Sequence, residues 1–168
     1  MRAWLVITSN EHQVVQFDGP TLELITDGRS RFDQRLAALG PDVLAARFDV
    51  ASFLKRLRHD DSGRPIGDAL LDQRTIAGIG NLWKCEGCFA ARIDPRRPAG
   101  SVSDDEALAV VRAARPGMQQ SASDGMQDRH RTIYGRAGRP CPRCGEPLRS
   151  RGQGDDNRIT YWCASCQL

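Results

Sequence analysis

The most informative segment of the sequence is Leu71-Asp72-Gln73-Arg74-Thr75-Ile76-Ala77-Gly78-Ile79-Gly80-Asn81-Leu82-Trp83-Lys84-Cys85-Glu86. Two helical patterns meet there at a turn that contains Gly78 and Gly80, which tolerate backbone angles that other residues resist. Asn81 begins the second helix, where its side chain can cap free N–H groups, and helix N-terminal amides attract anions. The turn therefore predicts a backbone cradle for a phosphate. On these residues alone, a glycine turn between two packed helices without a ligand explains the pattern equally well.

Residues 72–81, followed by Trp83, Glu86 and Phe89, resemble the helix-two-turns-helix segment of the formamidopyrimidine-DNA glycosylase / endonuclease VIII family, especially its actinobacterial endonuclease VIII-like type. This resemblance implies a protein that repairs oxidised bases in DNA. It further implies that the turn clamps the DNA backbone beside the lesion. By the same resemblance, Gly78, Gly80 and Asn81 are DNA-binding residues, and Asn81 contacts a phosphate.

Length and composition set broad limits on the protein. A chain of 168 residues forms one ordinary domain or two small ones. The mean hydropathy is −0.48, and no apolar run approaches the length needed to span a bilayer or to act as a signal peptide. We therefore expect a cytoplasmic protein that joins the nucleoid when it binds DNA. In such a reducing compartment, six cysteines indicate metal ligands or free thiols rather than disulfides.

Charge is distributed unevenly along the chain. The net charge is only +3, but residues 129–168 hold eight arginines against Glu146, Asp155 and Asp156. A basic C-terminal segment suits a polyanion partner. The alternative is that arginine is simply abundant, since the chain has 22 arginines and only two lysines, Lys55 and Lys84.

The N-terminal residues 1–26 predict a small sheet. Residues 4–8, 14–17 and 22–26 are β-prone runs that would form a three-stranded meander. So small a sheet needs a partner layer. By resemblance, residues 1–36 correspond to the last strands of the family's N-terminal β-sandwich. The first part of that sandwich has no counterpart here, so we expect an N-terminally truncated or mis-started chain.

Residues 37–131 predict the helix-two-turns-helix domain. Asp49 can cap a helix whose apolar residues recur at helical spacing, and Pro65 fits the first turn of the next helix. Ser103 and Glu106 form a capping box for a later helix. Pro116 and Gly117 are expected to end that helix, and residues 117–131 then read as a flexible linker.

Two cysteine pairs near the C-terminus predict a metal site. Cys141-x2-Cys144 and Cys163-x2-Cys166 are separated by eighteen residues, enough for a β-hairpin with strands at residues 147–148 and 159–162. Four thiolates in tetrahedral geometry form a closed, structural Zn²⁺ site, with no position open for catalysis. The alternative is two reduced thiol pairs in an irregular tail.

Residues 132–168 resemble the family's C-terminal zinc finger through Tyr134-Gly135-Arg136 and the segment from Arg158 to the last cysteine pair. The resemblance implies that Arg158 contacts a DNA phosphate. The loop of residues 152–156 departs from the family pattern because it is slightly long and acidic. A third pair, Cys85 and Cys88, lies within a helix and is expected to be small buried residues, since no further ligands remain for it.

Catalysis in the resembled family uses an N-terminal proline amine, exposed after removal of Met, with a neighbouring Glu as acid and base and a Lys of the sandwich assisting. This chain starts Met1-Arg2-Ala3 instead. We therefore assign no catalytic residue to it. Lys55, Lys84 and the Met1 amine are the amines available. A solvated Lys84 would be mostly protonated and is not expected to act as a nucleophile.

Together, these features predict an α+β protein with a partial N-terminal β-sheet, a helix-two-turns-helix domain and a C-terminal zinc-finger β-hairpin. The expected function is that of a base-excision repair DNA glycosylase / AP lyase lacking the Pro-Glu nucleophile segment. The expected partner is double-stranded DNA with an oxidised-base or abasic lesion, bound by a monomer that carries one structural Zn²⁺. The main alternative is a non-catalytic zinc-dependent DNA-binding module. An RNA-binding zinc protein is a weaker alternative. The occurrence of the turn and the zinc finger together, in this order, argues against it.

Overall fold

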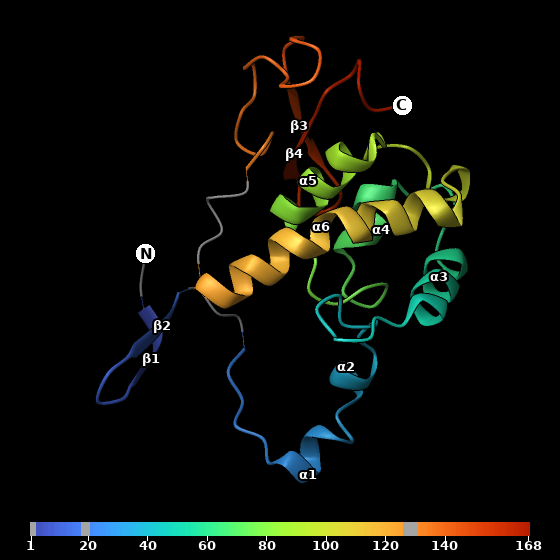
Figure 1. The fold of residues 1–168 in the computed structure, drawn as a ribbon. Helices are drawn as coiled ribbons and strands as arrows, with labels where there is room; N and C mark the ends of the chain where they lie inside the picture. The colour runs from blue at the N-terminus through green and yellow to red at the C-terminus, as the bar shows by residue number, and fades with distance from the viewer. Residues whose placement is uncertain (1–2, 18–20, 126–130) are drawn as a thin grey trace. The chain divides into compact units, whose positions relative to one another are not determined.

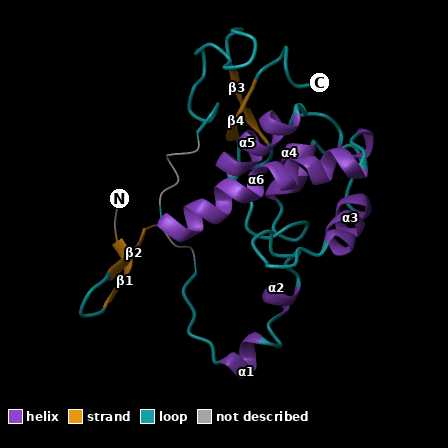
Figure 2. Cartoon of the chain, viewed as in Figure 1, coloured by secondary structure: helices purple, strands orange, loops and turns teal. Residues whose placement is uncertain are grey.

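The computed structural model describes residues 3–17, 21–125 and 131–168 and divides the chain into two units, Met1–Ala37 and Ala38–Leu168 (Figures 1 and 2). The first unit contains the antiparallel strands β1 (Ala3–Thr8) and β2 (Gln13–Phe17), in which Val6 pairs with Val15. Two single-turn helices follow, α1 (Asp27–Ser30) and α2 (Gln34–Ala37). The hairpin predicted at residues 4–8 and 14–17 is therefore confirmed.

The third predicted strand, residues 22–26, is wrong, since these residues join no sheet among those described. Thr26 instead acts as the N-cap of α1, where its Oγ1 accepts a hydrogen bond from Arg29 N. A β-prone run becomes a strand only when another strand completes its ladder of hydrogen bonds. Here the last residue of the run, Thr26, caps the next helix instead of extending a strand.

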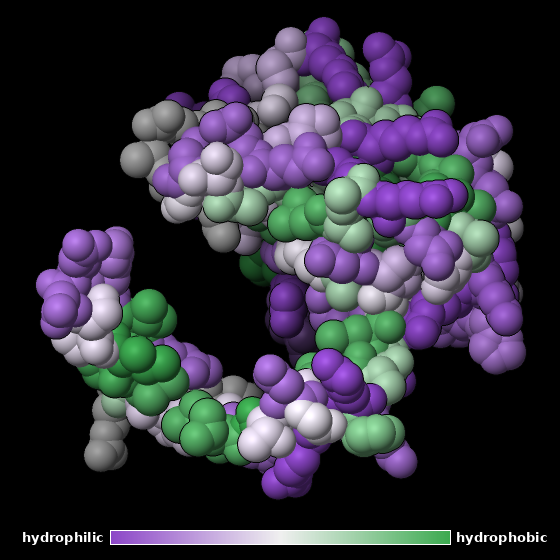
Figure 3. Space-filling model, turned by 60° about the horizontal axis from the view of Figure 1, so that its bottom comes forward, coloured by the Kyte–Doolittle hydropathy of each residue, from purple (hydrophilic) through white to green (hydrophobic). Residues whose placement is uncertain are grey.

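The first unit exposes its hydrophobic side chains (Figure 3). Ile7 and Val14 are 57% and 62% exposed, and none of the described residues of this unit is buried. A two-stranded sheet is one layer and cannot bury its own apolar face. The described residues of this unit thus form no hydrophobic core of their own.

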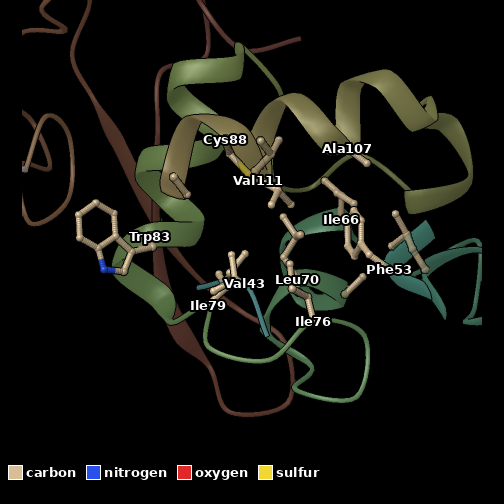
Figure 4. Close-up of a cluster of buried hydrophobic side chains, with 14 of the residues drawn as sticks. Val43, Phe53, Ile66, Leu70, Ile76, Ile79, Trp83, Cys88, Ala107 and Val111 are labelled. Atoms are coloured by element: carbon tan, nitrogen blue, oxygen red, sulfur yellow. The ribbon is translucent and has the colours of Figure 1, made fainter. Parts of the chain in front are cut away.

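The second unit is built on helices around a main core. Its helical elements are α3 (Val50–His59), α4 (Ile66–Leu71), α5 (Asn81–Ala91), the 3₁₀ turn η1 (Ala99–Ser101) and α6 (Asp104–Asp124). Figure 4 shows the core side chains converging, with Phe53 from α3, Leu70 from α4, Cys88 from α5 and Val111 from α6. This core fixes α4 and α5, and with them the glycine turn that joins them.

Local capping signals agree with the helix starts. Asp49 caps α3 by accepting a hydrogen bond from Ser52 N, and Ser103 and Glu106 form the predicted capping box of α6. Pro65 stands one position earlier than expected, at the N-cap of α4 rather than inside its first turn. Each of these signals acts within a few residues, which is why sequence alone locates the helix starts to within one position.

The linker predicted at residues 117–131 is wrong over the described part. Helix α6 continues through Pro116 to Asp124, and Gly125 ends it with a left-handed φ of 70°. Proline removes one backbone hydrogen bond from a helix. Here Met118 is buried in the core and Gly117 lies against the Trp83 ring, so tertiary packing holds the last turns. Residues 126–130 of the predicted linker lie outside the described residues.

The C-terminal segment forms a hairpin of β3 (Arg149–Gln153) and β4 (Arg158–Trp162), with Arg151 paired to Thr160. A second, smaller core of buried residues lies under it, made of Cys85, Phe89, Ile133, Cys141, Leu148 and Cys163. The fold is therefore α+β, as predicted. In the part of the chain that the structure describes, no helix has the length and apolarity to cross a membrane.

Candidate nucleic-acid interface and metal centre

The turn between α4 and α5 is held in shape by the side chain of Gln73. Its Oε1 accepts a hydrogen bond from Gly78 N at 2.8 Å, and its Nε2 donates to Ile79 O at 3.1 Å. Gly78 has a φ of 101°, and a Cβ there would lie 2.9 Å from Val43 Cγ1. Glycine is thus required at this position for two reasons, the backbone angle and the close approach of Val43.

At Gly80, unlike at Gly78, neither the backbone angle nor a close neighbour requires glycine. Its backbone is extended, with φ −103° and ψ 176°, and a Cβ there would meet nothing within 4 Å. Gly80 is the N-cap of α5 and provides no side-chain cap. It therefore leaves open space beside the first turn of α5, where the N-terminal amides of a helix favour an anion.

Asn81 does not cap α5 as predicted, because it is the first residue of the helix rather than its N-cap. Its Nδ2 instead donates a hydrogen bond to Ile159 O of β4 at 2.8 Å. An Asn amide carries two N–H groups, so one remains for a further acceptor. Asn81 Oδ1 is buried and has no hydrogen-bond partner among the described residues. The side chain thus ties the turn to the hairpin and keeps one donor.

One face of α5 binds β4 through polar contacts. Three α5 residues at helical spacing meet three consecutive residues of β4: Asn81 with Ile159, Lys84 with Thr160, and Cys85 with Tyr161. Residues i, i+3 and i+4 of a helix share a face, so one side of α5 fixes the position of the strand. Because Arg158 is the first residue of β4, the same contacts position its backbone beside the turn.

Lys84 is buried, which corrects the expectation of a solvated lysine. It is 1% exposed, and its Nζ donates to Thr160 Oγ1. Burial lowers the pKa of Lys84, because the charged amine loses its hydration, and nearby Cys85 and Asp68 oppose this shift. The amine is enclosed between α5 and β4 and cannot reach a DNA sugar without opening that contact.

Arg158 lies on the surface at the start of β4. Its Nε and Nη2 both approach Asp156 Oδ2, at 3.2 and 3.1 Å. The residue lines a polar hollow of about 210 Å³ beside α4, together with Asp68, Asp155 and Asp156. Burial raises the pKa of the Asp68 carboxyl in this hollow.

The three predicted DNA contacts of the turn lie together. Gly78, Gly80 and Asn81 line one open hollow of about 600 Å³ with Tyr134 and residues from the end of α6. Arg158 is not among its lining residues and faces the neighbouring polar hollow instead. The structure therefore groups the turn residues in one place and links Arg158 to them through Ile159.

Four cysteines form a candidate metal centre. The ligand atoms of Cys141, Cys144, Cys163 and Cys166 all lie within 4.8 Å of one another. Cys141 Sγ is 3.9 Å from Cys166 Sγ, and Cys144 Sγ is 3.5 Å from Cys163 Sγ. A tetrahedral ion with metal–sulfur bonds of about 2.3 Å separates its ligands by about 3.8 Å, so the four thiols have the size of one such site.

The third cysteine pair is buried, as predicted. Cys88 belongs to the main helical core and Cys85 to the core under the hairpin. Burial raises the pKa of the Cys88 thiol to about 12, so at neutral pH it remains a neutral thiol. Neither residue belongs to the four-cysteine cluster.

Two side chains anchor the finger in a way that was not predicted from the sequence. Glu86 is buried, and its Oε1 accepts hydrogen bonds from the backbone nitrogens of residues 132, 133 and 134, each at 2.9 Å. Gln167 accepts from Cys163 N and donates to Ile93 O, both at 2.8 Å. Glu86 stands out in the sequence as a carboxylate within an apolar helix, which is a signal for a buried polar anchor.

Comparison with known proteins places this geometry in context. The family model of the formamidopyrimidine-DNA glycosylase H2TH domain matches residues 39–130. A probable endonuclease 8 2 of Streptomyces coelicolor is 36% identical over a match that covers 97% of this chain and 61% of that protein. The DNA-(apurinic or apyrimidinic site) lyase Nei2 of Mycolicibacterium smegmatis is 33% identical over a match that covers 99% of this chain and 66% of that protein.

A solved structure gives the same result. The crystal structure of the MutM (Fpg) protein from Thermus thermophilus superposes with a TM-score of 0.70 at 35% identity, covering 83% of this chain and 57% of that one. The chain thus spans less than two thirds of the length of each of these relatives. The matched domain nevertheless occupies more than half of this chain, and the relatives match almost all of it. The chain therefore belongs to the formamidopyrimidine-DNA glycosylase / endonuclease VIII family.

Proposed function

We propose that this chain grips damaged duplex DNA in base-excision repair, with the glycine turn and the C-terminal finger acting as one phosphate-binding surface. The observation that carries the proposal is the hydrogen bond from Asn81 Nδ2 to Ile159 O, because it joins the two predicted DNA contacts. The open space beside Gly80 and the start of α5 suit one phosphate, and the Arg158 guanidinium suits another. The DNA would carry an abasic site, in keeping with the name of the Mycolicibacterium smegmatis relative, or an oxidised base, as the resemblance to the family implies.

We further propose that the four cysteines hold one structural Zn²⁺. Their thiolate donors and their spacing suit tetrahedral zinc, and four protein ligands leave no open position for a substrate. Bound zinc would fix the two knuckles from which β3 and β4 extend. The finger has a small core, so metal binding would supply much of its folding free energy.

The proposed chemistry is that of a DNA glycosylase / AP lyase, as the family relationship suggests. That reaction needs an uncharged amine that attacks C1′ of the sugar and forms a Schiff base. Lys84 is enclosed between α5 and β4, and Lys55 lines a hollow between α3 and the segment of residues 72–75, which is not the hollow at the glycine turn. Neither lysine is therefore proposed as the nucleophile.

The second candidate is a non-catalytic zinc-dependent DNA-binding module. The burial of Lys84 favours it, as does the position of Lys55 in a hollow that Gly78, Gly80 and Asn81 do not line. Both candidates share the DNA grip and differ only in the covalent step.

Borohydride trapping on a duplex with one abasic site, run beside a binding assay on the same duplex, tests both. A covalent adduct would establish the lyase, and Lys84→Met and Lys55→Met would then report whether a lysine forms it. Binding without an adduct would establish the module. Absence of binding to abasic and intact duplex alike would refute the proposed grip.

A further inference from the structure

We propose that Asp156 competes with DNA phosphate for the guanidinium of Arg158 and so sets how strongly the finger holds DNA. This inference rests on the proposed function, which gives Arg158 a phosphate partner. In the free protein the guanidinium already has an anionic partner, since both Nε and Nη2 approach Asp156 Oδ2. DNA binding at this residue is then an exchange of one anion for another.

The hairpin turn brings the two side chains together. Asn157 lies between them with a left-handed φ of 48°, and its N donates to Gly154 O at 3.0 Å. This turn places Asp156 two positions before Arg158 at the end of the hairpin. The edge formed by Nε and Nη2 is one of those with which an arginine binds two oxygens of a phosphate, so Asp156 occupies a phosphate-binding edge.

The turn is anchored to the helical part of the unit. A Cβ on Gly154 would lie 2.9 Å from Asp68 Oδ1, which shows how closely the turn packs on α4. Next to it, Gln153 Nε2 donates to Pro95 O at 3.0 Å. Because the backbone on the Gly154 side is held in this way, Asp156 stays within reach of Arg158.

Both partners of the ion pair remain open to an incoming phosphate. The Arg158 side chain is 50% exposed and the Asp156 side chain 73% exposed. Exposed ion pairs contribute little to folding stability, so removing Asp156 should not unfold the finger. The same exposure allows a phosphate to replace the carboxylate.

Asp155 provides a matched control beside Asp156. Both carboxylates line the same hollow, but among the described residues only Asp156 has an ion pair with Arg158. Asp155→Asn and Asp156→Asn make the same change in net charge at adjacent positions. A difference between the two variants therefore reports the direct contact rather than the general field of the finger.

The first experiment measures affinity for an abasic duplex at fixed salt. We expect Asp156→Asn to bind roughly 1.5- to 5-fold more tightly than the wild type, the range that exposed ion pairs span, and to exceed Asp155→Asn. In an Arg158→Met background the gain should disappear, as a double-mutant cycle requires. Equal gains from both Asn variants, or a gain that persists without Arg158, would overturn the proposal.

A second experiment needs no DNA. The Nε–Hε resonance of Arg158, identified by its loss in Arg158→Met, should shift in Asp156→Asn and stay in place in Asp155→Asn. Inorganic phosphate should then perturb this resonance at a lower concentration in Asp156→Asn than in the wild type. If phosphate perturbs the resonance at the same concentration in Asp156→Asn and in the wild type, Asp156 does not compete with phosphate.

The two experiments separate the possible failures. If Arg158→Met binds duplex as tightly as the wild type, the proposed DNA contact of Arg158 is wrong, whereas the phosphate titration still decides whether Asp156 competes. If duplex binding falls in Arg158→Met but Asp156→Asn brings no gain, the DNA contact holds and the competition is refuted.

Discussion

Asn81, the first residue of α5, donates a hydrogen bond to the main-chain oxygen of Ile159, a residue 78 positions further along the chain. The contact joins the glycine turn to the strand that begins with Arg158. Two segments that would each make a weak anion site are thereby held in one geometry.

Replacing Asn81 by Ala should weaken binding to abasic DNA by about 1–2 kcal/mol, the loss expected for a hydrogen bond to a charged phosphate. The helices should remain folded, since the side chain caps no helix. Fluorescence anisotropy gives the affinity and circular dichroism the helix content. Gln153→Ala is the matched control, because it removes another finger contact, to Pro95 O, without touching the turn. Equal losses from the two variants would mean that Asn81 acts only by holding the finger.

Replacing Cys141 by Ser should remove bound metal and disorder the finger, because three thiolates bind zinc much less firmly than four. Elemental analysis of the purified protein measures the metal, and a DNA-binding assay measures the consequence. Cys88→Ala serves as the control, since Cys88 is buried in the helical core outside the cluster. Unchanged metal content in Cys141→Ser would refute the four-cysteine site.

The buried amine of Lys84 should make stability depend on pH. Because burial lowers its pKa in the native state, the unfolded chain binds more protons between that value and the ordinary value of about 10.4. The free energy of unfolding should therefore rise as pH increases through this window, by at most about 1.4 kcal/mol per pH unit. Below this pH window, Lys84 does not contribute to the change of the free energy of unfolding with pH.

Urea unfolding at a series of pH values measures this effect as the difference between the wild type and Lys84→Met. The difference should change with pH only inside the window. Lys55→Met, on the exposed side of α3, controls for the loss of one positive charge. A pH-independent difference for Lys84→Met would show that its amine keeps the same pKa when the protein unfolds.

Replacing Gly117 by Ala should destabilise the protein, although Ala favours helix by about 1 kcal/mol over Gly. A Cβ at this position would lie 2.6 Å from Cη2 of the Trp83 ring, so the ring or α6 must shift. Overpacking of this kind typically costs about 1–3 kcal/mol. Urea unfolding measures the change, and Gln119→Ala, on the exposed side of the same helix, is the control. A more stable Gly117→Ala would mean that α6 and α5 are not packed this closely.

Features whose partners lie within a few residues can be predicted from the sequence alone. The glycine turn, the capping residues Asp49 and Ser103 and the two cysteine pairs all depend on local spacing, which the printed sequence contains. A two-residue gap between cysteines already places both thiols on one knuckle, and a cap already selects the first turn of its helix. For this reason the α+β class, a glycine turn between two helices and the four-cysteine cluster could be predicted before any coordinates, whereas the assignment of that turn to a helix-two-turns-helix segment rested on the family resemblance.

Features whose partners lie far away along the chain depend on the tertiary structure. Asn81 bonds to Ile159 instead of capping α5, Lys84 is enclosed by Thr160, and α6 continues past Pro116 because Gly117 packs on Trp83. Residues 22–26 form no strand because, among the described residues, no neighbouring strand pairs with them. In each case the local preference is small compared with the free energy of burying a side chain or completing a hydrogen bond. The surrounding fold therefore overrides the local signal.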